Sequence, residues 1–203
     1  MFNEHQAKIG RYARQDAGSM ARVYAFVLAT IQQGLWQTPE IMDSIDKEGL
    51  DSRFLWGFKY DAYTYLMEHH ETIYDVSMTL WRGHANPAHQ EYELTRYFAG
   101  LPGLGVVKGG FMVQLCFGLS GCLDSHNIKR YGLDERKFKA SRFKSASLKG
   151  KRTILRNYFN VIRSEGGCEG LWDSWCNYVA QQQPERYSNA YEVSELHLKA
   201  IGA

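Results

Sequence analysis

Apolar residues recur along most of the chain at intervals of three or four, the spacing of a buried helix face. No long window shows the alternation of a strand, and no internal repeat is visible. Glycine and proline interrupt the pattern at several points. The pattern therefore predicts an all-α fold, with helices over residues 22–33, 38–49, 61–70, 73–81, 88–99, 106–117, 128–131, 151–164, 171–181 and 193–200.

Two helix starts carry specific signals. Thr38-Pro39-Glu40 combines a capping residue, a proline at the first helical position and an acidic residue in the first turn. Asp124 or Ser125 is suited to cap the helix that runs through Tyr131. Trp172, Trp175 and Tyr178 follow helical spacing, which favours a core stripe over a platform for stacking bases.

Length and composition fit one globular unit over residues 1–203, because 44% of the residues are hydrophobic. Residues 1–22 are polar, and the apolar stretch 23–31 is too short to span a bilayer. We therefore expect a cytoplasmic protein without a membrane partner. The four cysteines lack the close pairs of metal sites, which favours reduced, packed thiols and predicts neither a metal site nor an iron–sulfur cluster.

Charge is distributed unevenly. Residues 129–156 contain eleven Lys or Arg and two acidic residues, a net of +9 in a chain whose total is +2. A basic segment of this kind suits an anionic polymer such as nucleic acid, although a solvated surface loop is the alternative.

A glycine-rich hairpin precedes this basic segment. Leu101-Pro102-Gly103-Leu104-Gly105 separates two predicted helices and leads directly into the second. Such a turn presents backbone N–H groups at a helix start, where a DNA phosphate can bind. We predict a phosphate grip by Gly103, Gly105, Val106 and Val107, with Lys108 adding charge or standing as an ordinary solvated lysine.

Together with two further elements, the hairpin resembles the helix-hairpin-helix DNA glycosylase superfamily. Leu123-Asp124-Ser125-His126-Asn127 lies about one helix after the hairpin, and residues 28–33 look like the early helix that ends in a glutamine. The resemblance covers roughly residues 20–135 and implies a two-lobed fold. One helical lobe would span 20–135, with the helix-hairpin-helix at 89–117, and the second lobe would combine 1–19 with 136–203 and hold most of the basic segment 129–156.

The resemblance also implies roles for individual residues. Asp124 would be the catalytic carboxylate, with a simple helix cap as the alternative. His126 would be an acid or base, or merely a packed residue, and Gln32 or Gln33 would fill the gap left by an extruded base, or end an exposed helix. Lys108 would serve the chemistry, and Lys129 and Arg130 would bind phosphate.

The sequence departs from the superfamily at the residue that distinguishes lyases. Val107 occupies the position of their Schiff-base lysine, and Lys108 is turned from it by about 100° around the helix. Residues 105–110 and 121–127 resemble instead a branch found with phage DNA hypermodification, the amino acid:DNA transferases or α-glutamyl/putrescinyl thymine pyrophosphorylases. That branch implies a location in a bacterial host cell.

The resemblance to this branch predicts an enzyme that binds double-stranded DNA, extrudes a modified thymine and attaches an amino acid or polyamine to a pyrophosphorylated 5-hydroxymethyluracil. Cations would stabilise the leaving pyrophosphate, and Mg²⁺ is one candidate. A monofunctional base-excision glycosylase is the alternative within the superfamily. The alternative that is not an enzyme is a non-catalytic DNA-binding module that keeps only the hairpin.

Overall fold

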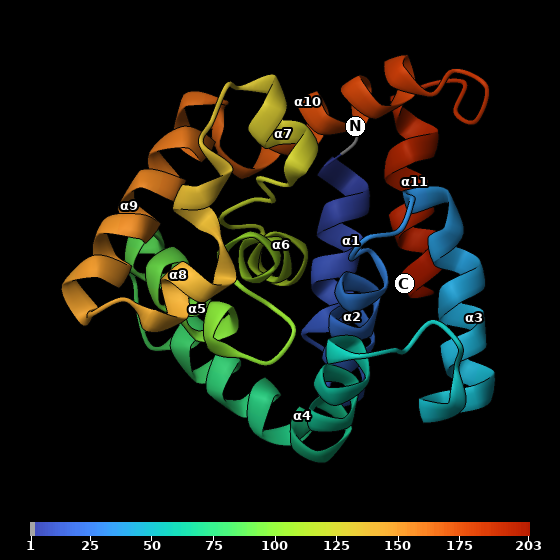
Figure 1. Cartoon of the computed structure of the whole chain (residues 1–203), viewed down its shortest axis with the longest axis horizontal. Coiled ribbons are helices and arrows are strands. Elements are labelled where there is room, and N and C mark those ends of the chain that lie inside the picture. The colour runs from blue at the N-terminus through green and yellow to red at the C-terminus, as the bar shows by residue number, and fades with distance from the viewer. Residues whose placement is uncertain (1–2) are drawn as a thin grey trace.

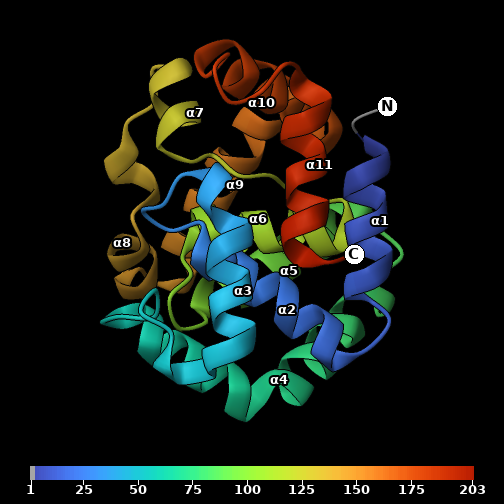
Figure 2. The same ribbon diagram turned by 90° about the vertical axis from the view of Figure 1, so that its right-hand side faces the viewer.

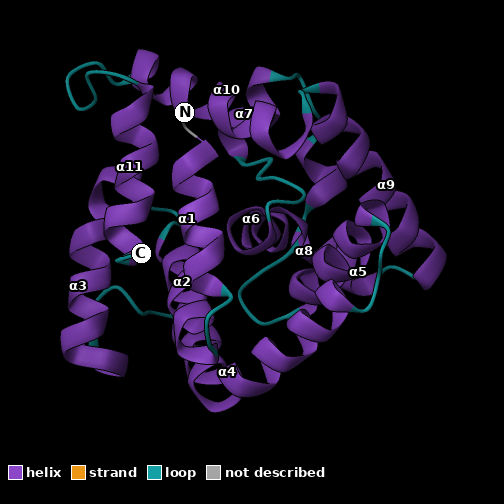
Figure 3. Cartoon of the chain, turned by 180° about the vertical axis from the view of Figure 1, so that it is seen from behind, coloured by secondary structure: helices purple, strands orange, loops and turns teal. Residues whose placement is uncertain are grey.

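The computed structural model describes residues 3–203, and every regular element among them is a helix (Figures 1 and 3). The all-α prediction is therefore confirmed. The α-helices are α1 (Asn3–Ala13), α2 (Ala17–Ala29), α3 (Thr38–Glu48), α4 (Phe58–Arg82), α5 (Pro87–Gly100), α6 (Val106–Phe117), α7 (Ser125–Arg130), α8 (Ala140–Ser145), α9 (Leu148–Ser164), α10 (Gly167–Gln182) and α11 (Ala190–Ile201). Short 3₁₀ turns lie at η1 (Leu35–Gln37), η2 (Gly49–Asp51) and η3 (Glu135–Phe138).

Helix α6 forms the centre of the molecule. It is seen end-on in Figure 1, with the other helices arranged around it. All of its residues are buried except Val107 and Lys108 in the first turn, which agrees with a sequence that is apolar on every side. The N-terminal end of α6 is consequently the part that reaches a surface.

The buried side chains form two clusters that meet at α6. The first unites α1 to α6 with parts of α10 and α11, and the second joins α7 to α9 with the edges of α5, α6 and α10. Helix α1 therefore packs with α2 in the first cluster, and Figure 2 shows α11 alongside α1. The two-lobed glycosylase-like arrangement and its boundaries at 20–135 and 136–203 stay predictions.

Several helix boundaries differ from the sequence pattern. Residues 58–82 form one helix because no glycine or proline separates the two predicted segments. Helix α2 begins at Ala17, where the Asp16 carboxylate accepts the Ser19 N–H at 2.7 Å, and it ends at Ala29. The predicted α3 is confirmed, although Thr38 lies inside the helix and donates its hydroxyl to the Leu35 carbonyl.

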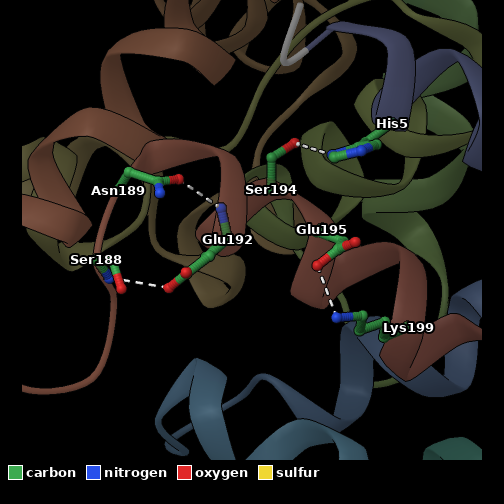
Figure 4. A network of polar contacts seen from close by, with 7 residues as sticks. All are labelled: His5, Ser188, Asn189, Glu192, Ser194, Glu195 and Lys199. Atoms are coloured by element: carbon green, nitrogen blue, oxygen red, sulfur yellow. Dashed lines mark hydrogen bonds and ion pairs between the residues drawn. The ribbon is translucent and has the colours of Figure 1, made fainter.

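Helix α11 is fixed by polar contacts at its start (Figure 4). Asn189 caps it by accepting the Glu192 N–H at 3.1 Å. One turn further, the Ser194 hydroxyl lies 3.1 Å from His5 Nδ1 on α1 and accepts the Trp172 indole N–H of α10 at 3.1 Å. These contacts connect α1, α10 and α11. No helix within residues 3–203 combines the length and the apolar character needed to cross a bilayer.

Candidate functional site

The hairpin between α5 and α6 is held tightly against its neighbours. Gly103 has a φ of +73°, and a Cβ there would lie 2.6 Å from Ala62 Cβ and 2.8 Å from Leu28. A Cβ on Gly105 would lie 2.6 Å from Ala140 Cβ. Both glycines are therefore needed for close packing of the hairpin, whatever else it binds.

An open cleft of about 860 Å³ runs past this hairpin. It is lined by residues 30–34, 58, 103–108, 123–126, 128, 135, 138–140 and 144. The first N–H groups of an α-helix have no partner within the helix, and no side chain caps α6. All four residues of the predicted phosphate grip thus line the cleft, at the uncapped start of a helix.

Lys108 lies where the cleft meets a second, inner pocket, and it lines both. Its Nζ donates to Thr30 Oγ1 at 3.0 Å and sits 5.5 Å from the ring centroid of Phe111. Val107 also lines the cleft and packs against the second core cluster. The amine next to the Schiff-base position therefore reaches the cavities in spite of its turn around the helix.

Asp124 occupies the same junction. One carboxylate oxygen accepts the Asn127 N–H at 2.9 Å, and the other lies 3.4 Å from Trp175 Nε1, a long contact. Asp124 is therefore the N-cap of α7, as the sequence allowed, and it also lines both cavities. The two interpretations of this residue are compatible.

The loop that carries Asp124 is tied down by side chains from other helices. The Tyr158 hydroxyl donates to the Gly121 carbonyl at 2.6 Å and accepts the Leu123 N–H at 3.0 Å. Gln114 accepts the Cys122 N–H at 3.1 Å. Burial raises the pKa of the Tyr158 hydroxyl, so it remains protonated and able to donate.

The other predicted site residues divide between those in the cavities and those outside them. His126 is exposed, lines both cavities and lies 6.4 Å from the Tyr178 ring. Lys129 and Arg130 are exposed on α7 and line neither cavity, and Arg130 donates to the Ser174 carbonyl at 3.1 Å. The structure does not bring these two cations to the cleft.

Both candidate plug residues follow the end of α2. Gln32 is exposed in the cleft with a φ of +58°, a left-handed conformation that is uncommon for a residue with a Cβ. Gln33 lines both the cleft and the inner pocket. They stand in the turn that follows α2, because this helix ends at Ala29 and not at residue 33 as predicted. Their role as a plug stays a prediction.

The inner pocket, of about 140 Å³, lies behind the cleft. Its walls come from α6, α10 and α11 and from residues 30, 33–35, 122, 124, 126 and 127. Trp172 is buried in the core, as predicted, whereas Trp175 and Tyr178 are half-buried and pack against the core while lining this pocket. His197 on α11 lines it too, a residue that sequence reasoning missed because it lies far along the chain from every motif.

His197 is an uncharged histidine in an aromatic enclosure. Its Nδ1 lies 2.9 Å from the Val193 carbonyl, and only 1% of the residue is exposed. The pKa of His197 is lowered to about 4, mainly because the ring is buried; the Val193 hydrogen bond opposes this shift, and nearby Lys108 and His5 contribute to it. The side chain is neutral at physiological pH.

This buried neutral histidine predicts a loss of stability in acid. The unfolded chain takes up the proton near pH 6.5 and the folded protein only near pH 4, so between these values the unfolded state binds more protons. We expect this group to lower the free energy of unfolding by about 2 kcal/mol from pH 7 to pH 5. Urea unfolding of the native protein and His197→Phe at both pH values measures it, and parallel pH dependences would show that His197 is not held neutral.

All four cysteines are free thiols, as predicted. Burial raises the pKa of Cys122, in the inner pocket, and of Cys168 to about 12, so neither is a thiolate at neutral pH. Within residues 3–203, no group of three or more His, Cys, Asp or Glu side chains is placed to hold a metal ion. The structure therefore assigns no ligand residues to the Mg²⁺ ion that the resemblance suggested, and Mg²⁺ stays a prediction.

The basic segment contributes two cations to the cleft. Lys139, just before α8, and Lys144, within α8, line the cleft. Net charge alone indicated the segment but did not single out these two lysines.

Comparison with family models, with curated proteins and with solved structures finds no match to this chain.

Proposed function

We propose that this protein is an enzyme that binds duplex DNA in the cleft and acts on a pyrimidine base extruded into the inner pocket. One observation carries the proposal: Gln33, Lys108, Asp124 and His126 all line both the cleft and the inner pocket. A base that leaves the duplex and enters the pocket passes these four side chains. Enzymes that modify a base must take it out of the stack in this way.

The uncapped start of α6 and the cleft lysines support the duplex-binding half of the proposal. The helix start offers N–H donors to one phosphate, and Lys139 and Lys144 offer positive charge to others. Gln32 and Gln33 stand beside the pocket entrance, where a side chain can occupy the gap in the duplex.

The chemistry that we propose is transfer of an amine to the base. The nitrogen of an amino acid or polyamine attacks the exocyclic methylene carbon of a pyrophosphorylated 5-hydroxymethyluracil, and the bond from that carbon to the pyrophosphate oxygen breaks. Pyrophosphate leaves with the bonding electrons, and Asp124 accepts the proton lost by the amine. Lys108 stabilises the charge that develops on the leaving group.

Nucleoside mass spectrometry tests the reaction. A duplex with pyrophosphorylated 5-hydroxymethyluracil is incubated with the protein and with single amino acids or putrescine, and the nucleosides are then analysed. We expect an amine adduct together with free pyrophosphate. An unchanged nucleoside with every amine overturns the transfer chemistry.

Excision and simple binding are the other outcomes of the same experiment. Release of free base from duplexes that carry uracil, a mispair or an alkylated base would assign the protein to excision, in which Asp124 would assist departure of the base. Retained duplex affinity without any change in the DNA would leave only a DNA-binding module.

The cleft lysines give a prediction for DNA binding. Each phosphate contact contributes about 0.9 to the slope of log affinity against log salt, so the Lys139→Gln/Lys144→Gln variant is expected to reduce that slope by about two. Fluorescence anisotropy with a short duplex over a range of salt concentrations measures it. The matched control Lys8→Gln/Arg11→Gln removes two exposed charges from α1, outside the cleft. An equal reduction of the salt slope in this control would show that Lys139 and Lys144 do not contact phosphates.

A further inference from the structure

The inner pocket contains a hydrogen-bond acceptor without a donor. A backbone carbonyl only accepts, so the 2.9 Å contact with Val193 requires the His197 proton to be on Nδ1. Because the ring is neutral, Nε2 on its far edge carries a lone pair. Among residues 3–203, the only hydrogen bond of His197 is the one from Nδ1, and the residue lines the inner pocket. Nε2 can therefore accept an N–H from a molecule that occupies the pocket.

The surroundings of His197 suit a flat ring. The ring centroids of Trp172, Trp175 and Phe111 lie 4.7, 5.4 and 6.2 Å from that of His197, and Tyr178 also lines the pocket. A benzene molecule fills an engineered apolar cavity of about 150 Å³. The 140 Å³ of this pocket therefore suits one six-membered ring. Extruded bases are read by stacking on aromatic side chains and by hydrogen bonds to the Watson–Crick edge.

We infer that His197 selects uracil-type bases by accepting the ring N3–H of the extruded pyrimidine at Nε2. The N3 atom of uracil and thymine rings carries a hydrogen between two carbonyl groups, whereas N3 of cytosine carries a lone pair. Against His197 Nε2, a cytosine ring would place two acceptors face to face. Lys108 lines the same pocket and offers a donor to a carbonyl oxygen beside the imide. This inference rests on the proposed extrusion of a base and adds the residue that distinguishes the uracil-type ring from cytosine.

The experiment compares three bases at one position of a duplex. The target is 5-hydroxymethyluracil, 5-hydroxymethylcytosine or N3-methylthymine, each opposite an abasic residue so that the base pairs with nothing. The duplex carries 2-aminopurine next to the target, whose fluorescence reports extrusion, and anisotropy gives the affinity. We expect the full-length protein to bind 5-hydroxymethyluracil at least about tenfold more tightly than the other two, since a lost hydrogen bond of this kind is worth about 1.4 kcal/mol or more.

Two variants assign the preference to His197. His197→Phe keeps a ring but removes the acceptor, and we expect its affinities for the three bases to fall within about twofold of one another. His197→Gln keeps an acceptor and should retain part of the preference. The N3-methylthymine comparison needs no substitution, so the inference remains testable if a variant does not fold.

The outcomes separate this inference from the function on which it rests. Equal affinity of the native protein for all three bases, with extrusion observed, overturns the inference and leaves base extrusion intact. A preference that His197→Phe retains also overturns it, because another group then reads the ring. Absence of binding to every duplex overturns the proposed function itself.

Discussion

Asp124→Asn is expected to slow the reaction on the extruded base by about 100-fold or more while duplex affinity stays within about threefold of the native value. Asparagine caps helices about as well as aspartate, so the bond from the Asn127 N–H at 2.9 Å can be kept. The substitution removes only the negative charge and the ability to accept a proton. General-base catalysis contributes about 10²–10⁴ in rate, and stabilisation of developing charge contributes on a similar scale.

The matched control for this substitution is Asp16→Asn. Asp16 caps α2 by accepting the N–H three residues later, at 2.7 Å, and it lines neither cavity. Single-turnover rates, measured by nucleoside mass spectrometry, should fall for Asp124→Asn alone, and affinities from anisotropy should stay near the native value for both variants. If Asp124→Asn kept the native rate, the carboxylate would be only a helix cap.

Tyr158→Phe is expected to lower the free energy of unfolding by about 3 kcal/mol. The substitution removes the hydroxyl that donates to the Gly121 carbonyl and accepts the Leu123 N–H, and both backbone groups would be left in a buried position. Each such unpaired group costs about 1–3 kcal/mol. For a chain of this size the loss corresponds to a fall of about 10 °C in Tm.

The same substitution should also reduce the reaction rate, because the loosened segment leads directly into Asp124. Thermal and urea unfolding give the stability, and single-turnover rates measured well below the lowered Tm give the activity. Tyr60→Phe is the control, since that tyrosine is exposed and lines neither cavity. An unchanged Tm for Tyr158→Phe would mean that Tyr158 does not hold the loop.

The fold was predictable where local signals agree. The bounds of α6 match the predicted 106–117 because an apolar run lies between Gly105 and Gly118. The pattern divided α4 in two because its apolar spacing weakens near residue 71, although nothing there breaks a helix. The left-handed turn at Gln32 has no sequence signature, since glycine is the residue that such a conformation favours.

Only the residues of the candidate site that belong to contiguous sequence motifs were predictable. Lys108 and Asp124 belong to contiguous motifs that a reader of the sequence can recognise. His197 and Trp175 come from α11 and α10, and only tertiary packing brings them to the pocket. Helical spacing describes which residues share a face, but it does not tell a cavity wall from a filled core. The role of His197 Nε2 as an acceptor can therefore be inferred only from the hydrogen bond and the burial that the structure shows.

The central position of α6 determines which partner must deform when the protein meets DNA. The hairpin sits on the end of a helix in which ten of the twelve residues are buried. Close-packed protein interiors have low compressibility, so this helix resists displacement. A tilt of the hairpin toward a phosphate would have to open the core around it. We therefore expect the duplex to bend to the protein, at about 1–6 kcal/mol of elastic work, so that flexible DNA steps beside the target base would be bound in preference to stiff ones.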